Sequence, residues 1–251
     1  MPSTIMITGA TAGFGAAIAT TFARKGYRLI ITGRRTERLQ QLAAQLKAEG
    51  NEVCSLVFDV RNRKAVKAAI DELPTNWRNI DILVNNAGLA LGRDTFHEAN
   101  LDDWDTMIDT NVKGLLYVSH AVAPLMIAQG SGHIINIGSI AGKEVYPAGN
   151  VYCATKHAVD AISKSQRIDL LPYGIKVTAV HPGAAETEFS LVRFKGDAAK
   201  AAAVYQGFTP LSAQDVADVV AYVASVPKHV CINDIVVMPT AQANSTTFFK
   251  Q

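Results

Sequence analysis

Cysteine is scarce in this sequence: among 251 residues only Cys54, Cys153 and Cys231 are cysteines. Their number is odd, they lie far apart, and no Cys-x-x-Cys or Cys/His cluster joins them. This argues against a disulfide framework and against a zinc site, and we expect no metal. Sparing use of cysteine is typical of a reducing setting, so we expect a cytoplasmic protein.

The sequence also lacks an excess of charge of one sign and any long apolar run. Lysine and arginine total 24 and aspartate and glutamate 22, which gives a formal net charge of +2. No stretch of like charge is long enough to follow a phosphate backbone, so we expect no nucleic-acid partner. No apolar run approaches the roughly 18 residues that span a bilayer, and the opening MPSTIMITGA has no basic leader, so we expect no membrane association.

What the sequence does have is a regular alternation of apolar, β-branched runs with helical patterns. The apolar runs are nearly continuous, which is typical of strands buried on both faces of a parallel sheet. We predict an α/β fold: a single doubly wound Rossmann domain over residues 1–251, with about seven parallel strands, helices on both faces and a substrate loop at about 183–210. Predicted strands lie at 4–8, 28–32, 53–58, 80–84, 133–138, 175–180 and 234–238, and predicted helices at about 13–25, 37–49, 62–73, 102–128, 151–172 and 213–224.

The segment TGATAGFG, residues 8–15, follows the first predicted strand and opens the first helix. Glycines at such a place let the backbone approach a pyrophosphate at a helix N-terminus. The spacing of the three glycines differs from the commoner G-x-G-x-x-G, so the prediction of a dinucleotide turn depends on its position between strand and helix. A plain tight turn is the alternative. The predicted cofactor contacts in this segment are Gly9, Thr11, Gly13, Phe14 and Gly15.

Two arginines follow the second predicted strand, where enzymes that use NAD carry an acidic residue that holds the adenosine ribose. The sequence there reads TGRR, with Gly33 before Arg34 and Arg35. A guanidinium binds a 2′-phosphate through forked hydrogen bonds whereas a carboxylate repels it, so we predict NADP, with Arg34 as the main contact and Arg35 as the second. The alternative is a pair of solvated charges at a helix start.

Asp59 and Val60 follow the third predicted strand. A carboxylate and a backbone amide at this place are suited to hold an adenine, and both are predicted to contact the cofactor. A helix cap explains Asp59 equally well.

Residues suited to proton transfer follow the fifth predicted strand. Ser139 ends the fifth strand, and Tyr152 stands thirteen residues later near the start of a long helix, with Lys156 one turn further on. The i, i+4 spacing puts the ammonium and the phenol on one helical face. Ser139 is predicted to hold the substrate oxygen while Tyr152 gives or takes the proton. A buried ring beside a solvated amine is the alternative for Y-x-x-x-K by itself.

An acid or base must titrate near neutrality to work there, and a free tyrosine titrates near 10. Lowering its pKa by roughly three units requires about 4 kcal/mol. One ammonium about 4 Å away supplies roughly that much at an effective dielectric constant near 20. We therefore predict that Lys156 tunes Tyr152, and a cationic nicotinamide pushes the pKa in the same direction.

With TGATAGFG, NNAG at 85–88, YCATK at 152–156 and HPGAAET at 181–187, the chain resembles the classical short-chain dehydrogenase/reductase family over essentially its whole length. The resemblance implies a catalytic tetrad of Asn111, Ser139, Tyr152 and Lys156, in which Asn111 holds a water or a backbone turn that completes a proton relay. It also implies dimers or tetramers built on the helices 102–128 and 151–172. Further cofactor contacts implied by the resemblance are Asn85, Asn86, Ala87, Gly88, Tyr152, Lys156, Pro182, Gly183 and Thr187.

More narrowly, stretches such as GNVYCATK and EFSLVRFKGD are similar to those of the bacterial NADP-dependent 3-hydroxy acid dehydrogenases, also described as serine or allo-threonine dehydrogenases. This implies a small hydroxy acid as substrate, and a carboxylate needs a cation. We predict that Arg193, in preference to Lys195 and Lys143, binds this carboxylate. Ser139 and Tyr152 are the other predicted substrate contacts. Glu186 departs from the subgroup's pattern and stands where it would repel such a carboxylate. The same chemistry on a ketone or 3-oxoacyl substrate, or NADPH binding without turnover, are the alternatives.

Overall fold

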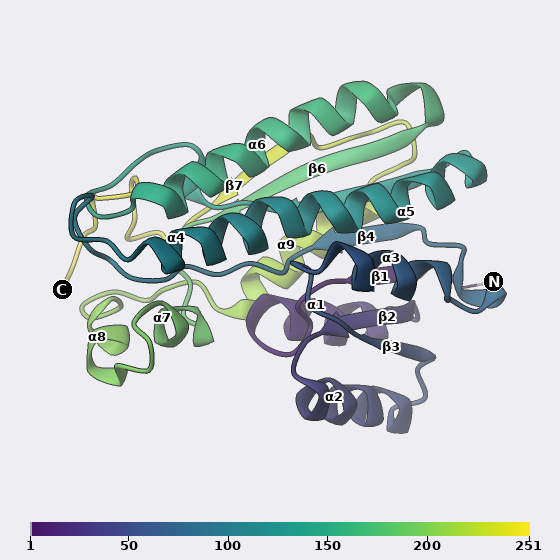
Figure 1. Ribbon diagram of the computed structural model, residues 1–251, viewed down its shortest axis with the longest axis horizontal. Helices are drawn as coiled ribbons and strands as arrows, with labels where there is room; N and C mark the ends of the chain where they lie inside the picture. Colours follow the sequence, from purple (N-terminus) through teal and green to yellow (C-terminus); the bar gives the residue numbers. More distant parts are fainter. Residues whose placement is uncertain (1) are drawn as a thin grey trace.

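The computed structural model describes residues 2–251 and contains one wholly parallel, seven-stranded sheet in the order β3-β2-β1-β4-β5-β6-β7 (Figure 1). All seven predicted strands are present, and the α/β doubly wound prediction is confirmed. The strand order reverses between β1 and β4, which is where ligands bind in open sheets of this kind. The strands are β1 Thr4–Ile7, β2 Arg28–Gly33, β3 Val53–Val57, β4 Ile82–Asn85, β5 Gly132–Ile137, β6 Ile175–Pro182 and β7 Asp234–Val237.

Helices cover both faces of the sheet because neighbouring residues of each strand point to opposite sides. In β1, Ile5 and Ile7 pack in the core under α1, α2 and α9, whereas Met6 packs in the core under α3 and α5, with α6 beside them (Figure 1). The helices are α1 Gly13–Arg24, α2 Thr36–Ala48, α3 Arg63–Asp71, α4 Leu101–Ile108, α5 Leu115–Gln129, α6 Asn150–Leu170, α7 Glu188–Arg193, α8 Ala198–Ala203 and α9 Ala213–Ser225.

Two segments differ from the sequence prediction. The helix predicted over 102–128 is divided by a π-helical turn, Asp109–Gly114, between α4 and α5. The predicted substrate loop contains α7 and α8, which are capped by the side chains of Thr187 and Asp197. These short helices escaped prediction because too few residues carry their apolar periodicity.

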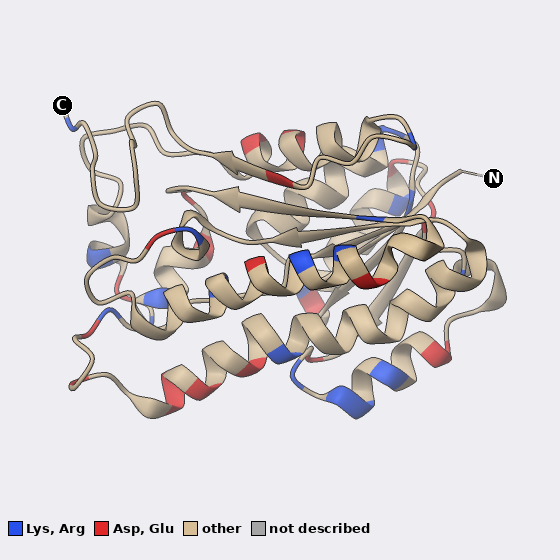
Figure 2. Ribbon diagram, turned by 90° about the horizontal axis from the view of Figure 1, so that it is seen from above, with Lys and Arg blue, Asp and Glu red and all other residues tan. Residues whose placement is uncertain are grey.

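Charged side chains are interspersed in sign along the helices, and the strands are largely free of them (Figure 2). Within residues 2–251, no helix combines the length and the hydrophobicity that crossing a bilayer requires.

Candidate active site

The glycine-rich turn between β1 and α1 is shaped by contacts that exclude side chains. Gly9 and Gly13 have φ values of 67° and 51°, in the left-handed region that favours glycine. A Cβ on Gly15 would lie 2.3 Å from the carbonyl oxygen of Gly9, so the helix packs directly against the turn. The N-cap residue, Ala12, offers no side-chain cap. The first N–H groups of α1 are therefore suited to bind an anion.

Asn86 and Thr8 fasten this turn to the end of β4. The Asn86 side chain donates to the carbonyl oxygens of Thr8 and Gly9 at 2.9 and 3.2 Å. The Thr8 hydroxyl accepts from the N–H groups of Asn86 and Ala87, each at 3.0 Å. The shape of the turn is thus set by a neighbouring strand as well as by its own glycines.

A first cavity of about 270 Å³ opens beside the turn, at the carboxyl ends of the central strands. It reaches from the arginines after β2 to the tyrosine of α6, a span suited to an extended ligand. The predicted cofactor residues that line it are Gly9, Thr11, Gly13, Phe14, Arg34, Arg35, Asp59, Val60, Asn86, Ala87, Gly88, Tyr152, Lys156 and Thr187.

Four predicted cofactor residues lie outside the first cavity. Gly15 is packed against Gly9, and Pro182 and Gly183 line a second cavity instead. Asn85 is 4% exposed, and its amide donates to side chains in the core. The expectation for Asn85 is wrong because successive strand residues face opposite sides of the sheet, and Asn86 faces the turn.

The two arginines after β2 differ in how they are bound. The Arg34 side chain is 56% exposed and lies 3.8 Å from Asp59. Arg35 donates to the Thr11 hydroxyl at 3.0 and 3.1 Å and to a Glu188 carboxylate oxygen at 3.0 Å. Arg34 is therefore the freer cation, and Arg35 ties the turn to the start of α7.

Asp59 lies on the rim of the first cavity and pairs with Arg61 at 2.7 Å. A hydrogen bond from Arg61 is the main reason that the pKa of Asp59 lies below its usual value. Asn62 caps α3, with its side chain accepting from the N–H of Ala65 at 3.1 Å. The interpretation of Asp59 as a helix cap is therefore wrong.

A second cavity of about 600 Å³ meets the first at Tyr152. Ser139, Tyr152 and Arg193, the three residues predicted to bind substrate, all line it. Its wall is completed by residues of α7 and of the C-terminal segment, among them Phe248, whose ring centroid lies 5.0 Å from that of Phe208.

Tyr152 and Lys156 lie one turn apart on α6 and are 8% and 7% exposed. The Lys156 ammonium donates to the carbonyl oxygen of Ile137 at 3.0 Å, which holds it against the end of β5. Ser139 follows that strand in extended conformation, and its hydroxyl accepts from the N–H of Ala141 at 3.1 Å. The carboxyl end of β5 thus places Ser139 beside Tyr152 of α6.

The prediction that Lys156 alone brings the phenol near neutrality is wrong. Burial raises the pKa of Tyr152 above its usual value, although Ser139 and Arg193 lower it. Burial also lowers the pKa of Lys156 to about 8, and its ammonium lies 5.9 Å from the Tyr152 ring centroid. The attraction of this ammonium therefore does not offset the burial of Tyr152. A positive charge bound in the first cavity, which Tyr152 lines, would lower the pKa of Tyr152.

Asn111 lies in the π-helical turn and is 2% exposed. Its side chain accepts from the N–H of Leu89 and donates to the carbonyl oxygen of Leu89, both at 2.8 Å, and donates to the Thr155 hydroxyl at 3.0 Å. A Cβ on Gly88 would lie 3.2 Å from Asn111 and 3.6 Å from the ammonium of Lys156. Asn111 therefore holds a backbone turn beside Lys156, and it does not itself line either of the two cavities.

Of the three cations considered for a substrate carboxylate, Arg193 alone lines the second cavity. It donates to the carbonyl oxygen of Gly92 at 3.2 Å and to the Tyr146 hydroxyl at 3.0 Å. Lys195 pairs with Asp103 at 2.8 Å, and Lys143 lies in an ion-pair cluster behind Ser139. Two of the three candidates are thus bound by carboxylates of the protein itself.

Glu186 is exposed and lines neither cavity, although its neighbours Ala185 and Thr187 line the second, so its carboxylate does not face a substrate directly.

Sequence reasoning missed several residues of the second cavity, because they come from segments far apart in the chain. A local signal existed only for Tyr146, an aromatic residue just before α6. Among the missed residues are Arg93, Tyr146, Phe189, Tyr205 and Lys250.

Comparison with known proteins identifies relatives along nearly the whole chain. The NADP-dependent 3-hydroxy acid dehydrogenase YdfG of Salmonella typhi is 50% identical over 240 residues, which cover 95% of this chain and 96% of the relative. Sulfoacetaldehyde reductase 2 of Chromohalobacter salexigens is 50% identical over 244 residues, covering 97% and 96%. The closed form of serine dehydrogenase complexed with NADP+ superposes with a TM-score of 0.92 at 47% identity and covers 99% of each chain.

The sequence profile described as short chain dehydrogenase matches residues 3–197, which include β1 to β6 and the residues Asn111, Ser139, Tyr152 and Lys156. With the relatives above, this match shows that the chain belongs to the short-chain dehydrogenase family.

Proposed function

We propose that the protein is an NADP-dependent oxidoreductase that transfers hydride between the 3-hydroxyl carbon of a small hydroxy acid and NADP. The substrates that we consider are serine, allo-threonine, 3-hydroxyisobutyrate and the pair 3-hydroxypropionate and malonic semialdehyde. The guanidinium of Arg193 carries this proposal, because it lies 5.6 Å from the Tyr152 ring in the cavity that Ser139 also lines. A planar guanidinium binds a carboxylate through paired hydrogen bonds and thereby orients the neighbouring hydroxyl.

NADP fits the first cavity on three grounds. The turn at Gly9 and Gly13 has no room or conformation for larger residues, and the start of α1 lacks a side-chain cap. Arg34 presents an exposed guanidinium at the far end, where a 2′-phosphate needs positive charge. Gly15 and Asn86 support the turn from behind, and Pro182, Gly183 and Thr187 are proposed to close the other end.

The chemistry divides among four side chains. Ser139 donates a hydrogen bond to the substrate oxygen, and Tyr152 gives that oxygen a proton in reduction or takes it in oxidation. Lys156 holds the ribose beside Tyr152, and Asn111 keeps the Leu89 backbone in place beside it. When bound, NADP supplies the hydride acceptor or donor and, in its oxidised form, a positive charge that lowers the pKa of Tyr152.

A small sulfonate is the second candidate substrate class. Sulfoacetaldehyde reductase 2 is as similar to this chain as the hydroxy acid dehydrogenase is. Arg193 offers a sulfonate the same charge and the same donors as a carboxylate.

Turnover with each substrate tests the proposal. The enzyme is mixed with NADP or NAD and each hydroxy acid, or with NADPH and sulfoacetaldehyde, and reduced nicotinamide is followed by its near-ultraviolet absorbance. We expect turnover with NADP and a hydroxy acid, and Tyr152→Phe lowers kcat by roughly a thousandfold because the proton donor is lost. Tyr222→Phe, at an exposed position of α9, is the matched control and leaves kcat unchanged.

Other outcomes select the alternatives. Reduction of a ketone or a 3-oxoacyl substrate without activity on any hydroxy acid would indicate another carbonyl substrate. NADPH binding without turnover on any carbonyl would indicate a binding protein.

We further propose a single catalytic domain that works in the cytoplasm as a homodimer or homotetramer. One sheet takes strands from residue 4 to residue 237, and the three cysteines are free thiols. Leu116 of α5 and Ile168 of α6 are 42% and 72% exposed, and Leu171 follows α6 at 73%. Exposed apolar residues on these helices support an interface there. Light scattering on the purified protein measures the assembly, and a monomer contradicts it.

A further inference from the structure

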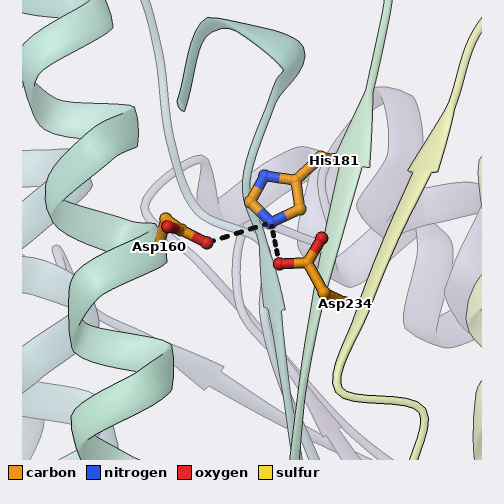
Figure 3. A group of neighbouring side chains, drawn as sticks. All are labelled: Asp160, His181 and Asp234. Carbon is orange, nitrogen blue, oxygen red and sulfur yellow. Dashed lines mark ion pairs between the residues drawn. The ribbon is translucent and has the colours of Figure 1, made fainter. Parts of the chain in front are cut away.

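Behind Ser139, on the side away from both cavities, four charged or titratable side chains meet. Figure 3 shows the imidazole of His181, on β6, between the carboxylates of Asp160, on α6, and Asp234, on β7. Nε2 of His181 lies 3.3 Å from Asp234 and 3.7 Å from Asp160. The Lys143 ammonium lies 2.6 Å from each carboxylate, so the position that a cation would take is held by the protein itself.

The other edge of the imidazole faces the backbone of the active site. Nδ1 of His181 lies 3.2 Å from the carbonyl oxygen of Ser139, and the ring is 0% exposed. A Cβ on Gly138 would lie 2.4 Å from Nδ1, so the ring packs directly on the backbone before Ser139. His181 thus contacts both residues that follow β5, Gly138 and Ser139.

The surroundings of the ring determine which nitrogen carries its proton. The Ser139 carbonyl can only accept a hydrogen bond, so the 3.2 Å contact is a hydrogen bond only when Nδ1 carries a proton. Within residues 2–251, Nε2 makes no hydrogen bond, although it lies 3.3 Å from Asp234. Lys143 pairs with both of the carboxylates that Nε2 faces, and Lys164 lies 2.6 Å from Asp160. Burial, which is the largest cause, and Lys143 lower the pKa of His181, although Asp234 and Asp160 raise it. The contact at Nδ1 and the lowered pKa fit a neutral ring whose single proton is on Nδ1.

We propose that His181 is a positioning residue, which holds the backbone of Ser139 in register with Tyr152 through the Nδ1–H hydrogen bond to the Ser139 carbonyl. The cluster joins the elements that must stay aligned. Lys143 directly follows the turn that begins at Ser139, and Asp160 lies one helical turn beyond Lys156 on α6. This inference rests on the proposed catalytic role of Ser139.

Two substitutions of His181 separate positioning from packing. His181→Leu fills the space but donates no hydrogen bond. The amide nitrogen of His181→Asn stands as many bonds from Cα as Nδ1 does and can donate to the same carbonyl. We expect His181→Leu to lower kcat about tenfold or more with the KM for NADP within about twofold, because small misplacements of a reacting group cost large factors in rate. His181→Asn restores most of that kcat.

His133→Leu is the matched control, since His133 is also a buried histidine of the sheet, on β5, and bonds to the Thr178 hydroxyl at 2.7 Å away from Ser139. It should leave kcat unchanged. The inference is overturned if His181→Leu leaves kcat unchanged, or if His181→Asn loses as much as His181→Leu.

A second measurement distinguishes failure of this inference from failure of the proposed function. If the wild-type enzyme turns over no substrate, nitrogen NMR of the histidine rings still reports which nitrogen of His181 is protonated. A proton on Nδ1 supports the inference, and a proton on Nε2 alone overturns it.

Discussion

Arg34 and Arg35 illustrate how residues with the same charge take different parts. Both line the first cavity, but Arg35 is already bound to Thr11 and Glu188. Arg34 retains an exposed guanidinium, so a 2′-phosphate gains more from it. From the sequence, the two arginines could be ranked as phosphate contacts only by their order after the strand.

Replacing Arg34 by alanine should therefore weaken the binding of NADP and leave the binding of NAD nearly unchanged. We expect the KM for NADP to rise at least tenfold, since hydrogen bonds to charged groups contribute about 1.5–3 kcal/mol. The KM for NAD, which has no 2′-phosphate, stays nearly constant. Steady-state kinetics with both cofactors measure this, and Arg63→Ala, at an exposed position of α3, is the control. Equal losses with NADP and NAD would contradict the assignment.

At the scale of elements, the π-helical turn between α4 and α5 carries Asn111, whose side chain joins three segments. Asn111 bonds to both backbone groups of Leu89 and to Thr155, which ties the helix to the segment after β4 and to α6. Single π-helical turns inside helices are frequent at functional sites, and this one places Asn111 beside Lys156. Sequence periodicity predicted the helix over this region but could not predict the interruption, because its partners lie 22 and 44 residues away.

Asn111→Ala should destabilise the fold as well as the active site. The N–H and carbonyl of Leu89 lose their partners, so we expect the free energy of unfolding to fall by about 2–4 kcal/mol. Denaturant titration measures it. Thr110→Val is the matched control, because the neighbouring Thr110 hydroxyl is buried without a hydrogen-bond partner, and its loss should cost little. Similar losses in both variants would refute the role of the Leu89 contacts.

The whole molecule places its cavities where strands from distant parts of the chain end together. Strands β1, β4 and β5 meet side by side although residues 7 and 132 are far apart in sequence. The second cavity adds residues of α7 and Lys250 from the end of the chain. The fold thus assembles the site from segments that carry no common local pattern.

Burial of a histidine in the sheet, His133, makes the stability of the molecule depend on pH. Burial, with a smaller contribution from Lys176, lowers the pKa of His133 to about 3. The unfolded chain takes up this proton near pH 6.5 and the folded chain does not, so stability is complete above about pH 6.5 and falls as the pH approaches 3. Between pH 7 and pH 5 we expect a loss of about 2 kcal/mol from this group.

Unfolding titrations at several pH values measure this dependence. His133→Gln removes the titrating group while its amide can still bond to Thr178, so its stability should vary less over the same range. An unchanged slope in the variant would assign the dependence to other groups.

By itself, the sequence determined the parallel α/β architecture, the glycine turn, the arginines after β2 and the pairing of Tyr152 with Lys156. These features depend on local periodicity and on residues a few positions apart, which helix and strand geometry converts directly into shared faces. Tertiary structure alone decided that Arg193, of the three cations considered, lines the second cavity, that Asn111 holds Leu89, and that His181 lies behind Ser139. It also showed that burial outweighs Lys156 at Tyr152. Such outcomes depend on distances between separate elements and on exclusion of water, which only the packed fold establishes.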